Sequence, residues 1–384
     1  MANNNKHTGP NVPALRFPEF SGEWSKDCLN EFLEVQPARN TQGIYSKDDV
    51  LSVSGDYGVV NQIQLLGRSF AGKDVSNYHI VRTNDIVYTK SPLKEFPYGI
   101  VKTNQGTAGI VSTLYAVYSA KSNTDPKFVE YYFSSKERTN KYFKPIVRIG
   151  AKHDMKIGNE EVLRNIVVFP SKQEQNKIQE FLRIIDERIA TQSKIIEEQE
   201  TLLRSLRHKI YSRVQAQSQC TIADVLCYEQ PTKYLVTDTD YTDDDSQVPV
   251  LTANKAFILG YTTENFGIYD KGPCIILDDF TLDCKYVDFK FKVKSSAIKI
   301  LRAKAKTNLR FIFEYFRFLD LNTTEHRRHY IAEIEPMSIL LPSNEEIDRI
   351  ARLFTALDER LEAARKVLKI LESQKMYMLQ KMFI

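Results

Sequence analysis

The chain carries one helical sequence signature twice, at positions 172 residues apart. The first copy begins Pro170-Ser171-Lys172-Gln173-Glu174, and the second begins Pro342-Ser343-Asn344-Glu345-Glu346. The same offset takes Asp186-Glu187-Arg188 to Asp358-Glu359-Arg360. A spacing that holds without a gap over this length indicates a duplicated unit, with an unlike segment in front of each helix. We therefore expect the order globule, helix, globule, helix.

Composition limits the class of protein. With 384 residues, 42% hydrophobic and 27% charged, the chain has room for two or three folded domains. No apolar window reaches the ~18 residues of a membrane span, and the polar start is unlike a signal peptide, so we expect a cytoplasmic protein. Five cysteines without CxxC spacing favour reduced thiols over a disulfide scaffold or zinc site. A net charge of +4 permits an anionic partner without requiring one.

Each copy of the signature predicts a long helix. Ser171-x-x-Glu174 and Ser343-x-x-Glu346 are capping boxes, and each follows a proline, which is disfavoured inside a helix. Behind each cap, apolar residues recur in alternating steps of three and four, the stripe of a coiled coil. No proline interrupts either run, so each helix is expected to have about 40 residues and a length of about 60 Å.

The direction of the helices follows from connectivity. The first helix ends near Gln219, where the second globule begins, and the second helix starts near Pro342, where that globule ends. Because the termini of a domain are usually close together, the two helices should lie side by side and antiparallel. The last residues, 381–384, should then return to the first globule. The expected outline is nearly circular and pseudo-twofold.

The two globular segments share an order of elements more than a sequence. Short apolar runs between turn signals predict strands. Residues 128–133 and 310–319 are predicted to form helices, and each globule should end in an apolar strand, Ile166–Phe169 or Met337–Leu341. We divide the chain into domains at 1–169, 170–216, 217–341 and 342–384. The fold class is α+β, with two α/β domains of one type separated by two long helices.

Basic residues gather in both globules. Residues 285–310 hold nine Lys or Arg and one acid, and residues 121–156 hold nine Lys or Arg and four acids. Such patches can neutralise DNA phosphates, although they can equally be solvated surface. A basic element with a histidine also precedes the last strand of each globule. The candidate DNA-binding residues are Lys90, Lys102, Arg148, Lys152, His153, Lys285, Lys292, Lys294, Arg327, Arg328 and His329.

Several catalytic motifs are missing. The sequence has no GxxxxGK[ST] phosphate loop and no GxGxxG element, so neither an ATPase motor nor a dinucleotide site is expected. Asp278, Asp283 and Lys285 could hold a divalent metal, which leaves a metal-dependent DNA endonuclease as an alternative. A second alternative is a coiled-coil scaffold without DNA binding.

The repeated region and the N-terminal segment carry a family resemblance. Leu15-Arg16-Phe17-Pro18-Glu19-Phe20 with Glu23-Trp24 resembles the opening of specificity subunits of type I restriction-modification enzymes. Val168-Phe169-Pro170-Ser171 with Glu174-Gln175, followed by Asp186-Glu187-Arg188-Ile189, resembles their central conserved region. Pro342-Ser343 through Leu361 is similar to their distal conserved region, except that Ile347 stands where the first copy has Gln175.

The resemblance implies a non-catalytic subunit with two target recognition domains. Each would read one half of an asymmetric, bipartite site in double-stranded DNA, and the helices would set the spacer. It also implies two methyltransferase subunits and restriction subunits as partners. S-adenosylmethionine, ATP and magnesium would then belong to those partners, and this chain would need no cofactor.

Apolar residues beside the coiled-coil stripes predict the partner surface. An apolar band on a rod usually marks a protein interface, and the resemblance makes the methyltransferase subunits its occupants. The candidate partner-binding residues, which include positions beside the stripes, are Phe181, Ile184, Ile195, Leu202, Leu353 and Phe354.

Overall fold

The structure is a computed structural model that describes residues 11–93, 95–149, 155–252, 256–304, 307–321, 323, 325 and 327–384. It divides into two compact units. Unit 1 comprises Met1–Thr191 and Leu368–Ile384, and unit 2 comprises Gln192–Val367. Each unit therefore contains one globule together with a part of each long helix.

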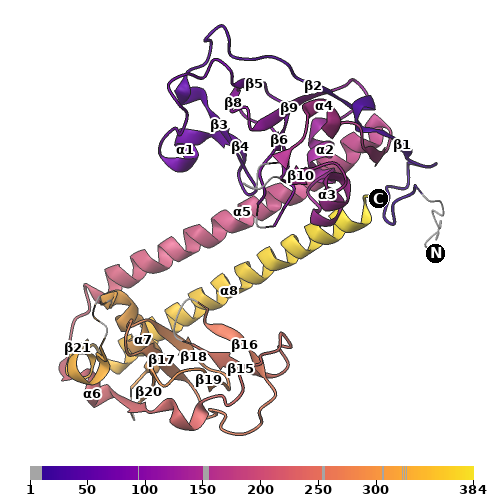
Figure 1. The fold of residues 1–384 in the computed structure, drawn as a ribbon. Coiled ribbons are helices and arrows are strands. Elements are labelled where there is room, and N and C mark those ends of the chain that lie inside the picture. The colour runs from indigo at the N-terminus through magenta and orange to yellow at the C-terminus, as the bar shows by residue number, and fades with distance from the viewer. Residues whose placement is uncertain are drawn as a thin grey trace. The chain divides into compact units, whose positions relative to one another are not determined.

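The two long helices are α5 (Lys172–Tyr211), with 40 residues, and α8 (Asn344–Lys381), with 38 residues (Figure 1). Their lengths confirm the prediction from the uninterrupted apolar stripes. No helix in the described part of the chain is both long enough and apolar enough to cross a membrane.

The helix starts confirm one half of each predicted capping box. Ser171 Oγ accepts the Glu174 N–H at 3.5 Å, and Ser343 Oγ accepts the Glu346 N–H at 3.2 Å. In the described part of the chain, neither glutamate carboxylate accepts the backbone N–H of its capping serine, which is the second bond of a capping box. The Glu174 carboxylate accepts bonds from two residues of the N-terminal segment, and the Glu346 carboxylate accepts one from Arg349.

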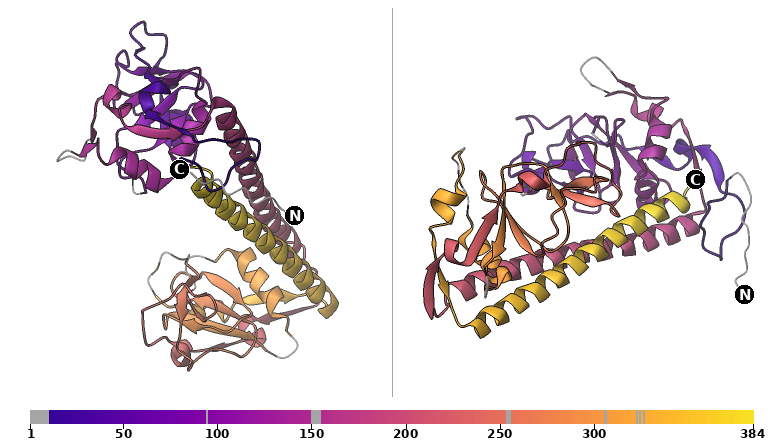
Figure 2. Two further views of the ribbon diagram at one scale, coloured as in Figure 1. Left: turned by 90° about the vertical axis from the view of Figure 1, so that its right-hand side faces the viewer. Right: turned by 90° about the horizontal axis from the view of Figure 1, so that it is seen from below.

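The segments of the two long helices run antiparallel within each unit (Figure 2). In unit 1, Lys375 on α8 pairs with Asp186 on α5 at 2.6 Å. In unit 2, Gln192 Nε2 donates to the Ala364 carbonyl at 2.9 Å. Gln192 and Ala364 are 172 residues apart, so the helices meet at equivalent positions of the repeat. The described stripe residues are all buried or half-buried: Ile178, Leu182, Ile185, Ile189, Gln192, Ile196, Gln199, Leu203, Leu206, Ile210, and Ile350, Phe354, Leu357, Leu361, Ala364, Leu368, Leu371, Lys375, Met378, Met382.

The globule of unit 1 is built on a four-stranded antiparallel sheet in the order β2-β9-β6-β7. The strands between β2 and β9 in the chain also form two two-stranded sheets, β3-β4 and β5-β8. The elements are β1 (Ser25–Cys28), β2 (Leu33–Val35), β3 (Leu51–Ser54), β4 (Gly58–Asn61), α1 (Gln62–Leu66), β5 (His79–Val81), β6 (Ile86–Thr89), β7 (Val101–Thr103), β8 (Gly109–Val111), β9 (Tyr115–Ala120), α2 (Pro126–Tyr132), α3 (Lys136–Phe143), β10 (Arg148–Ile149), β11 (Met155–Lys156), α4 (Asn159–Val162) and β12 (Ile166–Phe169).

The globule of unit 2 has a four-stranded antiparallel sheet in the order β14-β20-β17-β18 and a three-stranded sheet in the order β16-β15-β19. Within the three-stranded sheet, β15 and β19 are parallel. The elements are β13 (Ser218–Thr221), α6 (Ile222–Val225), β14 (Leu226–Glu229), β15 (Val248–Leu251), β16 (Ile258–Thr262), β17 (Cys274–Asp278), β18 (Cys284–Val287), β19 (Lys292–Val293), β20 (Ile298–Ala303), α7 (Leu309–Leu319) and β21 (Ser338–Leu341).

The two globules share a topology, as the order of predicted elements indicated. Their four-stranded sheets connect strands in the same order, and each is followed by the predicted helix, α2 or α7. The strand that precedes each long helix is also paired in the same register. Ser25 lies opposite Phe169, and Ser218 lies opposite Leu341, exactly one repeat length after Phe169. The duplication therefore includes the strand that leads into each helix.

In each unit, one hydrophobic core joins the four-stranded sheet, the helix α2 or α7, and the long helices. In unit 1, Phe128 of α2 shares a core with Tyr88 of the sheet and Leu182 of α5. In unit 2, Phe311 of α7 shares a core with Ile275 of the sheet and Phe354 of α8. Within each unit, α2 or α7 thus packs the globule onto the segments of α5 and α8, which together we call the rod.

The end of α8 returns to the first globule, as predicted. The Leu15 N–H donates to the Lys381 carbonyl at 2.9 Å. The Phe383 ring is 4% exposed and stacks on Phe128 with the ring centroids 5.4 Å apart. These contacts lie within unit 1 and close its hydrophobic core.

Candidate nucleic-acid interface

The repeated aspartate of the two long helices fixes each globule to the rod. The Tyr131 hydroxyl on α2 donates to Asp186 at 2.7 Å, and Arg310 on α7 donates to Asp358. Burial raises the pKa of Tyr131, and the neighbouring Asp186 raises it further, so the hydroxyl stays protonated and acts as the donor. Asp186 and Asp358 therefore have an anchoring role that would hold any DNA-reading surface in place.

A second anchor joins the N-terminal segment to the start of α5. Arg16 donates two bonds to the Glu174 carboxylate, both at 2.7 Å, and Trp24 Nε1 donates a third at 3.2 Å. Gln175 is fully buried and bonds to backbone at Asn123, Asp125 and Pro170. In unit 2, the corresponding Ile347 is 7% exposed and belongs to the apolar core, which accounts for the difference between the two copies.

A short hairpin presents cations on the first globule. Arg148 of β10 lies opposite Lys156 of β11, and both side chains are exposed. Like charges at opposite positions repel, so this arrangement suits an anionic partner. Lys152 and His153, predicted to bind DNA, lie outside the described residues. Lys156 was missed among the candidates, although its place at the end of the same basic run was a usable signal.

Two other lysines of unit 1 have partners inside the protein. Lys90 Nζ donates to Asn159 Oδ1 at 2.5 Å. Lys102 Nζ lies 3.7 Å from a carboxylate oxygen of Glu130, and its side chain is 19% exposed. Burial lowers the pKa of both lysines. These contacts favour a structural role for Lys90 and Lys102 over the expected contact with phosphate.

The structure contradicts two of the DNA-binding predictions in unit 2. Lys292 is fully buried, with Nζ 2.7 Å from Glu264 and bonded to the Phe266 carbonyl at 2.7 Å. His329 is 1% exposed, and Nδ1 lies 2.9 Å from Glu333. Both side chains fill and neutralise sites within the globule, so neither is available to DNA at the surface.

The remaining candidates of unit 2 stay accessible. Lys294 and Arg328 are exposed, and the Arg328 guanidinium lies over the Phe280 ring at 6.0 Å. Arg327 is exposed but pairs with Glu325 at 2.5 Å and also with Glu333, which offsets its charge. Lys285 is half-buried and faces a cavity beside the long helices.

The nuclease alternative gains no support from its residues. Asp278 Oδ1 accepts the N–H groups of Phe280 and Thr281, each at 2.9 Å, and so caps the turn between β17 and β18. No group of three or more His, Cys, Asp or Glu that could hold a metal occurs among the residues that the structure describes. The Asp278 pattern thus has a turn-forming explanation.

The predicted partner surface divides into exposed and buried positions. Ile184, Leu202 and Leu353 are 46%, 49% and 40% exposed, and Ile195 is also exposed. Within unit 2, Ile195 and Leu202 line a groove of about 330 Å³ together with Leu357 and Arg360. Phe354 is fully buried against α7, which contradicts its assignment as a contact residue.

Phe181 is half-buried and makes an edge-to-face contact with Phe17 at 5.8 Å, so it supports the N-terminal segment. Four exposed apolar residues of α8 were missed by the prediction, and one of them, Val367 in unit 2, is 43% exposed. Ile370, Met376 and Tyr377 are 65%, 63% and 53% exposed in unit 1. They are further candidates for the partner surface.

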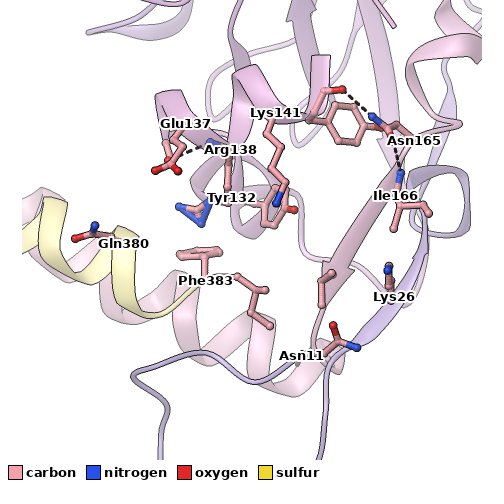
Figure 3. Close-up of a pocket in the computed structure, with 14 residues that line it drawn as sticks. Asn11, Lys26, Tyr132, Glu137, Arg138, Lys141, Asn165, Ile166, Gln380 and Phe383 are labelled. Atoms are coloured by element: carbon pink, nitrogen blue, oxygen red, sulfur yellow. Dashed lines mark hydrogen bonds between the residues drawn. The ribbon is translucent and has the colours of Figure 1, made fainter. Parts of the chain in front are cut away.

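A cavity of about 540 Å³ in unit 1 marks the junction of α3, β12 and the end of α8 (Figure 3). Arg138 Nη2 donates to the Leu379 carbonyl at 2.7 Å, and its guanidinium lies 4.6 Å from the Phe383 ring centroid. Burial lowers the pKa of Arg138 to about 10, so it remains charged at neutral pH. The arginine clamps the end of α8 to the globule.

Comparison with known proteins finds sequence similarity to a type I restriction enzyme specificity subunit. The chain is 42% identical over 158 residues to the Escherichia coli type I restriction enzyme EcoR124I/EcoR124II specificity subunit. That match covers 37% of this chain and 39% of the relative, so the chain spans well under half the length of the curated relative it matches. No protein-family model matches the chain.

Solved structures extend the similarity to nearly the whole chain. The S subunit of a type I restriction-modification system from M. genitalium has a TM-score of 0.65 at 14% identity, covering 97% of this chain and 99% of that one. A chain from a structure of type I restriction-modification complex assembly and conformational transition has a TM-score of 0.54 at 13% identity, covering 94% and 97%. In sequence this chain is thus related to a type I restriction enzyme specificity subunit, and it has the fold of such subunits.

Proposed function

We propose that this chain is the DNA sequence-specificity subunit of a type I restriction-modification complex. Each globule would read one half of an asymmetric, bipartite site in double-stranded DNA. The observation that carries the proposal is the duplicated globule-on-helix arrangement, in which equal strand registers lead into α5 and α8. The sequence relationship to a specificity subunit and the fold shared with others support it.

The exposed cations are the proposed contacts to DNA phosphates. In unit 1 these are Arg148 and Lys156 on the β10–β11 hairpin, and in unit 2 they are Lys294 and Arg328. Exposed arginine and lysine side chains position a protein on DNA, whereas base contacts give the sequence preference. Lys152, His153 and Arg327 remain weaker candidates.

The chain would contribute recognition and assembly, and no chemistry of its own. Two methyltransferase subunits would dock along the exposed apolar residues of the helices, including Ile184, Ile195, Leu202 and Leu353. Restriction subunits would join that core, in the cytoplasm. S-adenosylmethionine, ATP and magnesium would be bound by these partners.

Reconstitution with the methyltransferase subunit tests the proposal. The chain and that subunit together should bind and methylate DNA at one bipartite sequence, and the methyltransferase subunit alone should not. An Arg148→Ala, Lys156→Ala, Lys294→Ala, Arg328→Ala variant should bind more weakly, and its salt slope should fall by roughly one per lost phosphate contact. A complex that methylates DNA without sequence preference would contradict the proposed role.

A further inference from the structure

Unit 2 contains a cavity that the proposed role in DNA recognition does not use. Its volume is about 720 Å³, and all of its lining residues belong to unit 2. The wall is contributed by α5, α7, α8 and β18, so the cavity lies where the globule meets its part of the rod.

Positive charge dominates this wall. The cationic lining residues outnumber the carboxylates by six to three. They are Arg204, Arg207, Lys285, Arg310, Arg317 and Arg365, against Glu200, Asp358 and Glu362. The Cys284 thiol is neutral, because burial raises its pKa to about 11.

Part of this charge is neutralised inside the protein. Glu314 is fully buried and accepts bonds from Arg207 Nε and Arg310 Nη2, both at 2.7 Å, and Arg310 also pairs with Asp358. Arg365 pairs with Glu200 at 2.6 Å and with Glu362 at 2.5 Å. Among the residues that the structure describes, the carboxylates around the cavity pair with Arg207, Arg310 and Arg365, and not with Arg204, Lys285 or Arg317. The cavity therefore retains unmatched cations.

The buried arginines add an independent observation. Arg207 and Arg310 are 4% and 9% exposed, and both line the cavity. Arg207 Nη2 and Arg310 Nε have no hydrogen-bond partner within the described part of the chain. A buried donor without an acceptor is costly, and a planar guanidinium is suited to the oxygens of a phosphate. Both of these atoms are themselves inaccessible, so Arg207 and Arg310 contribute buried positive charge, and the donors that a ligand can reach lie on Arg204, Lys285 and Arg317.

Aromatic side chains extend the wall beyond the cations. Phe289 is 39% exposed, and its ring meets Phe257 edge to face with the ring centroids 6.3 Å apart. Arg310 already covers Tyr286 and Phe313, at 5.3 and 5.4 Å from their ring centroids. The pair Phe257 and Phe289 therefore presents the uncovered aromatic surface, and such surface stacks well on a nucleobase.

We infer that this cavity binds a nucleotide, with the phosphates at Arg204, Lys285 and Arg317 and the base near Phe257 and Phe289. Phosphate alone would explain the cations but neither the volume nor the aromatic wall. The inference does not depend on the proposed role in DNA recognition. A ligand here would contact both long helices and α7, and so would bind the globule of unit 2 more tightly to the rod.

Calorimetric titration of the full chain with ATP in the presence of a chelator tests this inference. Saturable binding of one ATP per chain is expected, with weaker binding of inorganic phosphate and none of adenosine. Lys285→Ala with Arg317→Ala should weaken ATP binding about tenfold or more, because charge-assisted bonds are lost. The control is Lys290→Ala, an exposed lysine outside the cavity that pairs with Asp270. This control should bind ATP normally, and circular dichroism would show that both variants are folded.

Three results would overturn the inference. The first is an absence of saturable ATP and phosphate binding, which would mean that Arg204, Lys285 and Arg317 are only solvated. The second is an equal affinity in the double variant and the Lys290→Ala control. The third is displacement of ATP by a short duplex of any sequence, which would assign the cavity to the DNA backbone.

Discussion

At the residue scale, ion pairs of this chain differ in burial and therefore in what they contribute to stability. Arg16 and Glu174 have side chains that are 4% and 2% exposed, whereas Lys177 and Glu19 are 54% and 48% exposed. Breaking a buried ion pair leaves an uncompensated buried charge and lowers the free energy of unfolding strongly, whereas breaking a solvated pair lowers it little.

Glu174→Gln should therefore destabilise unit 1 by about 3–5 kcal/mol, because the Arg16 guanidinium loses its buried counter-charge. Urea unfolding followed by Trp24 fluorescence measures this, since Trp24 is the one tryptophan of the sequence and is buried in unit 1. Glu19→Gln is the matched control and should cost less than about 1 kcal/mol. Equal costs for the two variants would show that the buried pair has no special role.

A second residue-scale prediction concerns pH. The hydrogen bond from Lys292 lowers the pKa of the Glu264 carboxyl from 4.5 to about 2. A lowered carboxyl pKa contributes stability above the unfolded value, and this contribution is lost as the pH falls from 4.5 through 2. Glu264→Gln should remove that part of the acid sensitivity.

Hydrogen–deuterium exchange of peptides from residues 237–264 would measure the effect. The N–H groups of Thr237 and Asp238 donate to Glu264, so their protection should fall with pH in the original chain. In Glu264→Gln, protection should be lower at neutral pH and should change less on acidification. Identical pH profiles for the two proteins would contradict the role of this pair.

At the scale of elements, the long helices were predictable and their side-chain partners were not. The three-four stripe and the serine caps are local patterns, and α5 and α8 form where those patterns run. The partner of Glu174 is 158 residues away at Arg16, which no local pattern reveals. Lys292 stands in a basic run, but the pairing of β19 with β15 places it inside the globule.

The same distinction explains the partner surface. Ile184, Ile195 and Leu202 fall on one stripe of α5 at 3.6 residues per turn and stay exposed. Phe354 is buried because α7 packs on it. The periodicity of α8 alone does not show that a helix of the globule covers this position. Helix periodicity predicts a face, but tertiary packing decides which faces remain free.

Replacing Ile184 and Ile195 with Lys should abolish co-purification of the methyltransferase subunit while circular dichroism stays helical. Charged side chains in an apolar interface would be desolvated without partners. Ala190→Lys with Glu197→Lys is the control, because these exposed positions lie on another side of α5. Normal complex formation by the Ile184, Ile195 variant would place the interface elsewhere.

At the scale of the whole molecule, the repeat determines what the two units can have in common. Equal strand registers and equal sheet orders indicate that both globules are mounted on the rod in the same way. The nearly circular, pseudo-twofold outline stays a prediction, as do the domain boundaries at 169, 216 and 341. If the rod separates two readers, its length should set the spacer of the DNA site.

Inserting four residues after Gln199, within α5, should therefore lengthen the spacer and leave both half-site sequences unchanged. Four residues extend a helix by about 6 Å and a little more than one turn, so the apolar stripe is nearly preserved. Sequencing of methylated DNA from cells that express the variant with its partners gives the new site. New half-sites at the old spacer would contradict the rod as a ruler.

The central claim is that each globule reads one half-site independently. Exchanging residues 217–341 for the same segment of a related subunit, followed by methylation-sensitive genome sequencing, tests it most directly. The segment holds the strands β13 and β21, which pair with each other, so the exchange keeps that sheet intact. The account predicts that one half-site changes while the other half-site and the spacer stay the same. A change in both half-sites would show that the globules read DNA jointly and would contradict the account.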